Sequence, residues 1–288
     1  MTTNHPAALR ATTAIACLAA AAFVGCAAPE RQPVAGVQAR LHAVTERAEL
    51  ISVDAAAPGR ILARKPISGL PAGERLVGID YRVARGVLYA LSSGGRLYTL
   101  DTGSGQLRPV GDAAAARLPA GAVGFDFNPA ADRIRVVGAD GSNLRLHPDT
   151  GALAATDPPL HYATGDAAHG QAPRVAAAGY TYNKKDDKLT TNYAIDLARG
   201  TLVTQGSVEG APVPVSPNTG RLYTVGALGT GPLEAAAFDI ADIDNTALAA
   251  LTRRGRTHLH RIDLATGAAR DLGRLGDGRA LWGLAIEP

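Results

Sequence analysis

Three aspartates recur at one place in a repeated pattern of the sequence and could do chemistry together. The pattern reads Gly78-Ile79-Asp80, Gly124-Phe125-Asp126 and Ala237-Phe238-Asp239. If the three segments surround one axis, their carboxylates can hold Ca²⁺ or another divalent cation. The structural alternative is that each aspartate accepts hydrogen bonds from backbone N–H groups of its own or the next repeat. This structural alternative predicts that the aspartate recurs together with the repeat unit.

Two histidines, His258 and His260, stand two residues apart and therefore share one face of a predicted strand. This spacing can seat two metal ligands. The corresponding positions of the other repeats are Tyr98, Leu144 and Tyr193 for the second histidine, and Arg96, Ser142 and Thr191 for the first. Because those repeats need no histidine, the sequence favours one packing histidine and one that faces solvent.

The longest irregular stretch, Thr156 to Val175, carries four side chains that could contact a ligand. Loops of this kind carry binding residues more often than the elements they join. The candidates are His161, Tyr162, Asp166 and His169. The alternative is a plain connector between two repeats.

Two arginines on successive predicted strands, Arg135 and Arg145, could bind an anionic ligand such as a carboxylate or a phosphate. The alternative is that they pair with Asp132, Asp140 or Asp149 at a solvated edge, where each ion pair contributes little.

Sequence signatures of common catalytic sites are absent. The chain has no Gly-x-Ser-x-Gly, no His-Glu-x-x-His and no phosphate-binding glycine loop. The sequence therefore favours a noncatalytic protein, and no cofactor is predicted apart from the divalent cation considered for the aspartates.

The elements that would position these residues form a repeat. Leading strands aligned on the Gly-x-Asp pattern recur at intervals of roughly fifty residues, and the two further copies are Gly179-Tyr180-Thr181 and Gly283-Leu284-Ala285. A second unit follows each leading strand except the last, with a glycine four residues after a polar residue. These pairs are Asp101 and Gly105, His147 and Gly151, Asp196 and Gly200, and Asp263 and Gly267. Alternating apolar residues around such a turn predict β-hairpins.

The two ends of the repeat array are each incomplete. The segment 41–70 has a hairpin but no leading strand, and the segment 280–288 is a leading strand with no hairpin. If the last strand completes the first sheet, the chain is an all-β protein with the architecture of a β-propeller. We count five four-stranded blades, the others at about residues 76–112, 122–165, 175–228 and 235–275. The alternative is six blades, because the fourth unit is long.

The N-terminal segment, residues 1–26, resembles a bacterial lipoprotein signal peptide: an apolar run of about fifteen residues ends in Phe23-Val24-Gly25-Cys26. Lipidation is then expected at Cys26, and ordinary cleavage after Ala27 or Ala28 is the alternative. Residues 27–40 read as a flexible tether, and residues 41–288 as one propeller domain. The sequence thus predicts an exported protein, an outer-membrane lipoprotein that faces the periplasm, or alternatively a secreted soluble protein.

The charge pattern does not favour nucleic acid as a partner. The formal net charge is +3, and no basic run is longer than Arg253-Arg254. Aromatic residues make up 5% of the chain, so stacking surfaces for bases or sugars are few. The expected partners are the membrane, through the lipid anchor, and an envelope protein or small ligand.

Several segments together resemble the bacterial family catalogued as domain of unknown function 4394. They are GFDFNPAADRIRVVGADGSNLRLHPDTG, PPLHYATGD, APRVAAAGYTYN and LWGLAIEP, and they lie between about Leu41 and the C-terminus. The resemblance implies a secreted or surface domain with a propeller-like fold, and it implies no catalytic residues.

Two functions remain open on the sequence alone. The first is a noncatalytic binding or scaffolding propeller anchored at the cell envelope. The second is a metal-dependent hydrolase or lyase with a divalent cation on the axis at Asp80, Asp126 and Asp239, an analogy with other propellers at the level of fold.

Overall fold

The computed structural model describes residues 1–3, 37–114, 118, 121 and 123–288, with backbone only at 113 and 114. The chain divides into two units, Met1–Pro33 and Val34–Pro288, and only the second is described below. Most of the predicted signal peptide 1–26, with Cys26, and most of the tether 27–40 therefore lie outside the described residues. No helix among the described residues is long and apolar enough to span a membrane.

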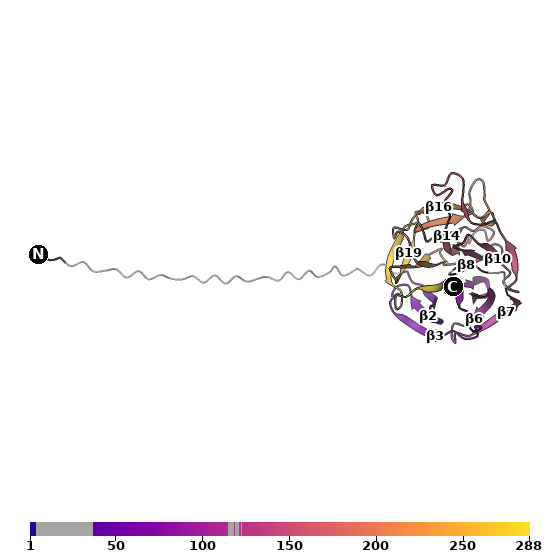
Figure 1. Ribbon diagram of the computed structural model, residues 1–288, viewed down its shortest axis with the longest axis horizontal. Helices are drawn as coiled ribbons and strands as arrows, with labels where there is room; N and C mark the ends of the chain where they lie inside the picture. The colour runs from indigo at the N-terminus through magenta and orange to yellow at the C-terminus, as the bar shows by residue number, and fades with distance from the viewer. Residues whose placement is uncertain (4–36, 115–117, 119–120, 122) are drawn as a thin grey trace. The chain divides into compact units, whose positions relative to one another are not determined.

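The second unit is built from five sheets arranged in a ring, which Figure 1 shows with the C-terminus near its middle. Blade 1 consists of β21 (Leu281–Ile286), β1 (Arg40–Thr45), β2 (Glu49–Asp54) and β3 (Ile61–Pro66). Blade 2 consists of β4 (Leu76–Arg82), β5 (Val87–Ser92), β6 (Arg96–Leu100) and β7 (Leu107–Ala114). Blade 3 consists of β8 (Val123–Asn128), β9 (Arg133–Gly138), β10 (Asn143–Leu146) and β11 (Leu153–Thr156).

The two remaining blades follow the same order from the axis outwards. Blade 4 consists of β13 (Val175–Tyr180), β14 (Asn192–Asp196), β15 (Thr201–Gln205), β16 (Arg221–Ala227) and the edge strand β12 (His161–Tyr162). Blade 5 consists of β17 (Ala235–Ile240), β18 (Ala247–Arg253), β19 (Arg256–Ile262) and β20 (Ala269–Arg274). Two short 3-10 turns, η1 (Val83–Arg85) and η2 (Pro217–Thr219), are the helices of the described residues.

Blade 1 joins the two ends of the propeller domain, as the sequence predicts. Strand β1 pairs antiparallel with β21, with Leu41 opposite Ile286 and Ala43 opposite Leu284. The ring therefore closes without a covalent link, and the prediction of an all-β propeller with five blades is confirmed.

The fourth unit is long because of one irregular blade, and it forms no sixth blade. Its tail supplies the fourth strand β16, and the preceding connector adds β12 in parallel at the outer edge. The Asp196 to Gly200 turn also lies one strand further in than its counterparts, because it joins the second and third strands of blade 4. The turns at Asp101 and Asp263 join third and fourth strands.

The apolar core is divided into five clusters, and each cluster lies between two neighbouring blades. One cluster, for example, combines Ala43 of blade 1 with Leu248 of blade 5, and another combines Phe125 of blade 3 with Leu91 of blade 2. A blade therefore buries its faces only against its neighbours, which explains why the sequence repeats the unit.

A glycine at the first position of the repeated pattern, present in four of the five inner strands, lets these strands approach their neighbours closely at the axis. A Cβ atom on Gly124 would lie 2.6 Å from Cγ2 of Val137 and 2.8 Å from the backbone nitrogen of Ala178 on the next inner strand. Any larger residue at this position would push β8 and β13 apart.

Candidate functional site

The three repeated aspartates meet at the axis. Asp80 on β4, Asp126 on β8 and Asp239 on β17 are all buried, with exposed fractions of 5%, 3% and 5%. One carboxylate oxygen from each lies within 4.8 Å of the other two. In the described part of the chain, this is the one group of three or more side chains with the spacing of metal ligands.

Each of these carboxylates also binds the backbone of the next inner strand that lies beside it. Asp80 Oδ2 accepts from the N–H of Phe127 at 2.8 Å. Asp126 Oδ1 accepts from the N–H of Tyr180 at 3.0 Å. The same contact closes the ring, because Asp239 Oδ2 accepts from the N–H of Ile286, on β21, at 2.6 Å.

These contacts are those of the structural alternative that the sequence raised. Two of the aspartates use their second oxygen within their own strand, where Asp80 accepts from Tyr81 N–H at 2.7 Å and Asp239 from Ile240 N–H at 2.6 Å. Where the pattern has a threonine, Thr181, the hydroxyl accepts from the N–H of Thr191 in its own blade. The aspartates therefore connect neighbouring blades whether or not a cation is bound.

Burial and mutual repulsion make these carboxyl groups weak acids. Burial, followed by repulsion from Asp239, raises the pKa of Asp80 well above its usual value. Burial, followed by repulsion from Asp80, does the same to the pKa of Asp126. Burial raises the pKa of Asp239 to about 7. The group can therefore share protons near neutral pH, or ionise fully if a cation offsets its charge.

Side chains and backbone almost fill the axis below the aspartates. The cavity there has a volume of about 10 Å³, and its lining includes Gly78, Gly124 and Trp282. This is close to the smallest space that holds one water molecule, about 10–15 Å³. The axis therefore provides no room for an organic substrate in this part of the ring.

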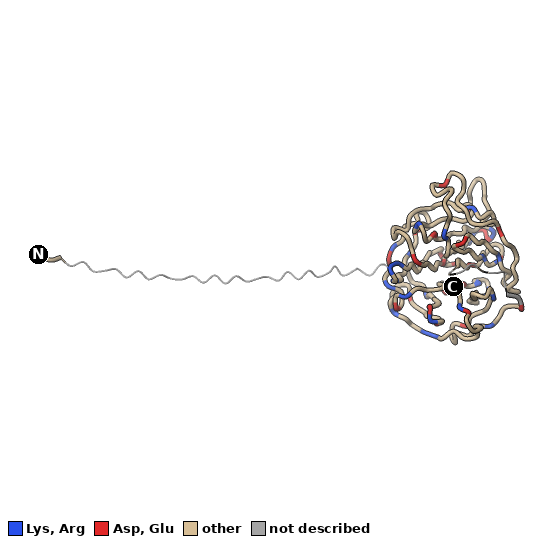
Figure 2. Tube along the Cα trace, viewed as in Figure 1, with Lys and Arg blue, Asp and Glu red and all other residues tan. Residues whose placement is uncertain are grey.

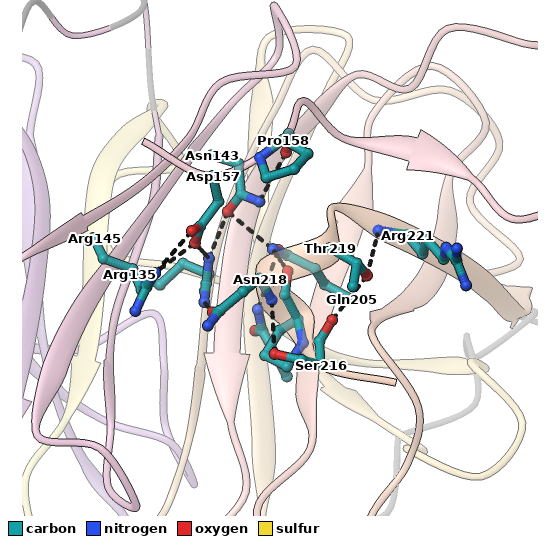
Figure 3. A network of polar contacts seen from close by, with 12 residues as sticks. Arg135, Asn143, Arg145, Asp157, Pro158, Gln205, Ser216, Asn218, Thr219 and Arg221 are labelled. Carbon is teal, nitrogen blue, oxygen red and sulfur yellow. Dashed lines mark hydrogen bonds and ion pairs between the residues drawn. The ribbon is translucent and has the colours of Figure 1, made fainter. Parts of the chain in front are cut away.

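A second polar cluster connects blade 3 to blade 4 and is centred on Arg135, which is 1% exposed (Figure 3). Its Nε donates to the hydroxyl of Tyr180 at 2.7 Å. Its other nitrogens donate to Asn143 Oδ1 at 2.5 Å, Asp157 Oδ2 at 3.0 Å and Asn218 Oδ1 at 2.5 Å. The guanidinium is thus enclosed by acceptors of the protein itself, which leaves little of it for a ligand.

Arg145 shares the carboxylate of Asp157 with Arg135 (Figure 3). Its Nε and Nη2 donate to the two oxygens of Asp157 at 2.9 Å and 2.8 Å. The expected pairing of these arginines with Asp132, Asp140 or Asp149 at a solvated edge is therefore wrong. Asp132 and Asp149 instead bind the buried Arg82 of blade 2. Arg135 is buried and Arg145 is partly exposed, and both guanidinium groups are held by Asp157 rather than by the turns that carry those acids.

The connector 156–175 packs on blade 4, and its four candidate residues do not converge on one point. Tyr162 is buried, and its hydroxyl donates to Asp196 Oδ2 at 2.6 Å. Asp166 accepts from the N–H and the hydroxyl of Thr224 at 2.6 Å and 3.0 Å. His161 and His169 are exposed. Two candidates thus hold the connector in place, and two face solvent.

The histidine pair of blade 5 is divided between packing and solvent. His260 is 9% exposed, and burial lowers its pKa. His258 is partly exposed, and its Nδ1 lies 3.0 Å from Asp271 Oδ2. The alignment of the repeats matches His260 to Tyr193 of β14 and His258 to Thr191, just before it, but β14 is the second strand of its blade and β19 is the third.

Some polar residues of these clusters carry no sequence signal. Asp157, Gln205 and Asn218 come from a connector, a strand end and a 3-10 turn, and only the fold brings them together. The sequence reading also missed a cross-strand pair, Ser52 Oγ and His42 Nδ1, which lie 3.0 Å apart. Both are buried between β1 and β2, so the pair is placed for packing rather than for attack on a substrate.

Comparison with known proteins identifies a family and a set of distant structures. A family model described as a domain of unknown function (DUF4394) matches residues 49–285. None of the curated proteins matches the chain. A structural genomics protein of unknown function from Bacteroides thetaiotaomicron has 12% identity and a TM-score of 0.48, with 82% of this chain and 58% of that chain covered.

Two other solved structures have a similarly low sequence identity to this chain. Dihydro-heme d1 dehydrogenase NirN has 13% identity and a TM-score of 0.36, with 84% of this chain and 44% of that chain covered. The Dos1 propeller has 10% identity and a TM-score of 0.41, with 77% and 54% covered. The chain thus spans between 44% and 58% of the length of these three proteins.

Proposed function

The chain belongs to the DUF4394 family of domains of unknown function, and we propose that it is a noncatalytic binding or scaffolding propeller of the cell envelope. One observation carries this proposal. The buried polar groups that could do chemistry at the axis are occupied by contacts between blades, and the cavity beside them measures about 10 Å³. Binding is then left to the outer faces and the rims of the ring.

The charges on these surfaces support a partner bound at a local site rather than along an extended polyanion. Basic and acidic residues are interspersed along the trace (Figure 2). Long runs of arginine and lysine that would follow a nucleic-acid backbone are absent from the sequence. The proposed partner is an envelope protein or a small ligand.

The noncatalytic part of the proposal is tested by a turnover screen. Purified protein is incubated with panels of ester, phosphoester, glycoside and peptide substrates, with added Ca²⁺ or Mg²⁺, beside the variant D126N. We expect no turnover that depends on the protein. Turnover by the wild type that D126N abolishes would refute the noncatalytic proposal.

The envelope part of the proposal rests on the N-terminal sequence, which places a cysteine after an apolar run. Cells that express the wild type or C26A are fractionated after labelling with a palmitate analogue. We expect the wild type to be labelled and membrane-bound, and C26A to be unlabelled. Label-free wild type in the soluble fraction would instead favour the secreted alternative.

A second candidate function is cation-dependent chemistry at the axis, and the spacing of the aspartate oxygens favours it. Oxygens within 4.8 Å of one another are compatible with one Ca²⁺, whose bonds to oxygen measure about 2.3–2.6 Å. Metal analysis of protein purified without chelator tests this candidate. A metal-free preparation whose melting temperature does not respond to Ca²⁺ would remove it.

A further inference from the structure

A groove on the side of the ring lies between blade 4 and blade 5, away from the axis. Its volume is about 730 Å³, and its walls are the connector after β16 and one face of β18, β19 and β20. Leu228 and Leu233 of the connector and Leu251 of β18 supply aliphatic lining. Ligand sites for small organic molecules measure about 300–1,000 Å³ and are mostly apolar, so the groove has the size and lining of such a site.

Three arginines stand at one end of this groove, in the turn between β18 and β19. Arg253, Arg254 and Arg256 all line it and are exposed. Arg253 and Arg256 are directly opposite each other in the strand pairing. Like charges in this arrangement destabilise a sheet. No acidic side chain among the described residues lies within ion-pair distance of these three guanidinium groups.

Two acidic residues lie at the groove or at the arginine turn. Asp271 lines the wall, but its carboxylate faces His258 at 3.0 Å and accepts from the N–H of Gly273 at 2.7 Å. Glu234 accepts from the N–H of Gly255, in the arginine turn, at 3.0 Å. Neither carboxylate forms an ion pair with the three arginines, although the charge of Glu234, which stands at their turn, offsets part of the positive charge there.

The fold itself does not require these arginines. Counted with the strand residues on either side, the equivalent turn of blade 1, between β1 and β2, contains one arginine, Arg47, and the turn between β5 and β6 also contains one, Arg96. One guanidinium is also directed towards the connector, because a Cβ atom on Gly231 would lie 3.9 Å from Nη2 of Arg253. A residue pair that weakens the sheet and borders an apolar groove suggests a site kept for a ligand.

We propose that this groove binds a small amphiphilic anion, with its carboxylate or phosphate at Arg253, Arg254 and Arg256 and its aliphatic part against Leu228, Leu233 and Leu251. The proposal rests on the noncatalytic binding function and gives it a ligand class. Arginine suits this role because its planar guanidinium binds carboxylate and phosphate groups with two parallel hydrogen bonds. The aliphatic walls contribute by removing the apolar part of the ligand from water.

Binding is measured by calorimetry on the purified full chain with octanoate as the probe. Acetate supplies the anion alone, and octanol the apolar chain alone. We expect octanoate to bind at least tenfold more tightly than either. Equal binding of acetate, or of octanol, would overturn the proposal, as would binding of phosphatidylglycerol vesicles without any binding of octanoate.

The double variant R253Q/R256Q then separates a ligand role from a structural one. It should bind octanoate at least tenfold more weakly and melt at a higher temperature, because the opposed charges are removed. The matched control R47Q, in the equivalent turn of blade 1, should change neither property. A double variant that binds octanoate like the wild type, or melts at a lower temperature, would overturn the proposal.

The octanoate experiments and the turnover screen can fail independently of each other. If the protein neither binds octanoate nor shows turnover, the proposed ligand site in the groove is wrong and the noncatalytic function stands. Turnover that D126N abolishes would overturn the noncatalytic function, because Asp126 lies at the axis and does not line the groove.

Discussion

The axial aspartates combine two roles that oppose each other energetically. As acceptors of backbone N–H groups they connect neighbouring inner strands, and hydrogen bonds to a charged acceptor are the stronger ones. As three carboxyl groups in a buried space they also repel one another when ionised. A proton shared within the group, or a cation, relieves that repulsion, so the stability of the ring depends on pH.

The direction of this dependence follows from the raised pKa values. The pKa of Asp239 is raised from 3.8 to about 7, so between these values the folded protein holds a proton that the unfolded chain releases. The free energy of unfolding contributed by this group is present below about pH 4 and is lost as the pH rises through about 7. We expect the wild type in the presence of a chelator to be less stable at pH 8 than at pH 5.

The substitution Asp126→Asn isolates this effect, because asparagine keeps the oxygen that accepts from Tyr180 and cannot ionise. At pH 8 we expect D126N to be more stable than the wild type, by about 1.4 kcal/mol for each unit of pKa elevation removed. At pH 3, below the usual pKa of aspartate, the two proteins should differ little, because Asp126 is then protonated in both the folded and the unfolded chain. Urea denaturation at both pH values measures the difference.

The control for D126N is Asp101→Asn, in the exposed turn between β6 and β7. The hydroxyl of Ser104 donates to this carboxylate and lowers its pKa, so its contribution is present at pH 8 and is lost as the pH falls. D101N should therefore be no more stable than the wild type at pH 8. If D126N showed the same pH dependence as the wild type, Asp126 would be ionised in the folded state throughout.

The sequence predicted the role of the aspartates better than that of the arginines, for a physical reason. An aspartate repeated at one place in three of the five units meets similar surroundings in each of those blades, so backbone contacts could be inferred. The partner of Arg135 on β9 is Asp157, which directly follows the edge strand β11 and lies on the far side of β10 from Arg135, so the two meet only through the pairing of three strands. Ion pairs of this kind depend on tertiary packing and leave no periodic pattern.

At the scale of the strands, glycine decides how closely the inner strands can pack. Gly124→Ala places a methyl group against Val137 and Ala178, and overpacking of a core typically costs about 1–3 kcal/mol. We expect a loss of this size in the free energy of unfolding, measured by urea denaturation.

Gly59→Ala is the matched control, because a Cβ there would meet only the carbonyl oxygen of Arg274 at 3.5 Å. Its effect should stay within about 0.5 kcal/mol or be slightly stabilising. Equal effects of G124A and G59A would mean that β8 and β13 do not approach as closely as described.

The strands of four blades could be placed from sequence because alternation and turn glycines are local signals. Blade 4 differs from the other blades in the strands that its turn joins. The turn that ends in Gly200 has the same hydrogen bond as the other turns, from the glycine N–H to a carbonyl four residues earlier. A local turn of this type fits between any two antiparallel strands, so its sequence could not show that it joins the second and third strands. The pairing of β14 with β13 shows that β14 is the second strand of blade 4, and this pairing places the turn between the second and third strands.

At the scale of the whole molecule, stability depends on closure of the ring. The five apolar clusters lie between blades, so the loss of one inner strand exposes the faces of its neighbours. Strand β21 pairs with β1, and its Ile286 N–H binds Asp239 of blade 5. The last strand therefore connects blade 1 to blade 5, and the ring should unfold as one cooperative unit.

Removal of residues 281–288 should abolish cooperative thermal unfolding, and a synthetic peptide of residues 280–288 added in trans should restore it. Circular dichroism follows the transition, and calorimetry measures peptide binding. A chain that lacks only Glu287 and Pro288, which are exposed, is the control and should melt cooperatively.

The same peptide with Gly283→Ala tests whether its register is the one described. A Cβ on Gly283 would lie 2.9 Å from both Cγ1 and the backbone nitrogen of Ile79 on β4, so the altered peptide should bind at least tenfold more weakly. Because the backbone hydrogen bonds to β1 are unchanged by this substitution, a weaker affinity reports contact with β4 of the neighbouring blade 2. A shortened chain that melts like the wild type without any peptide would show that the ring does not depend on its last strand.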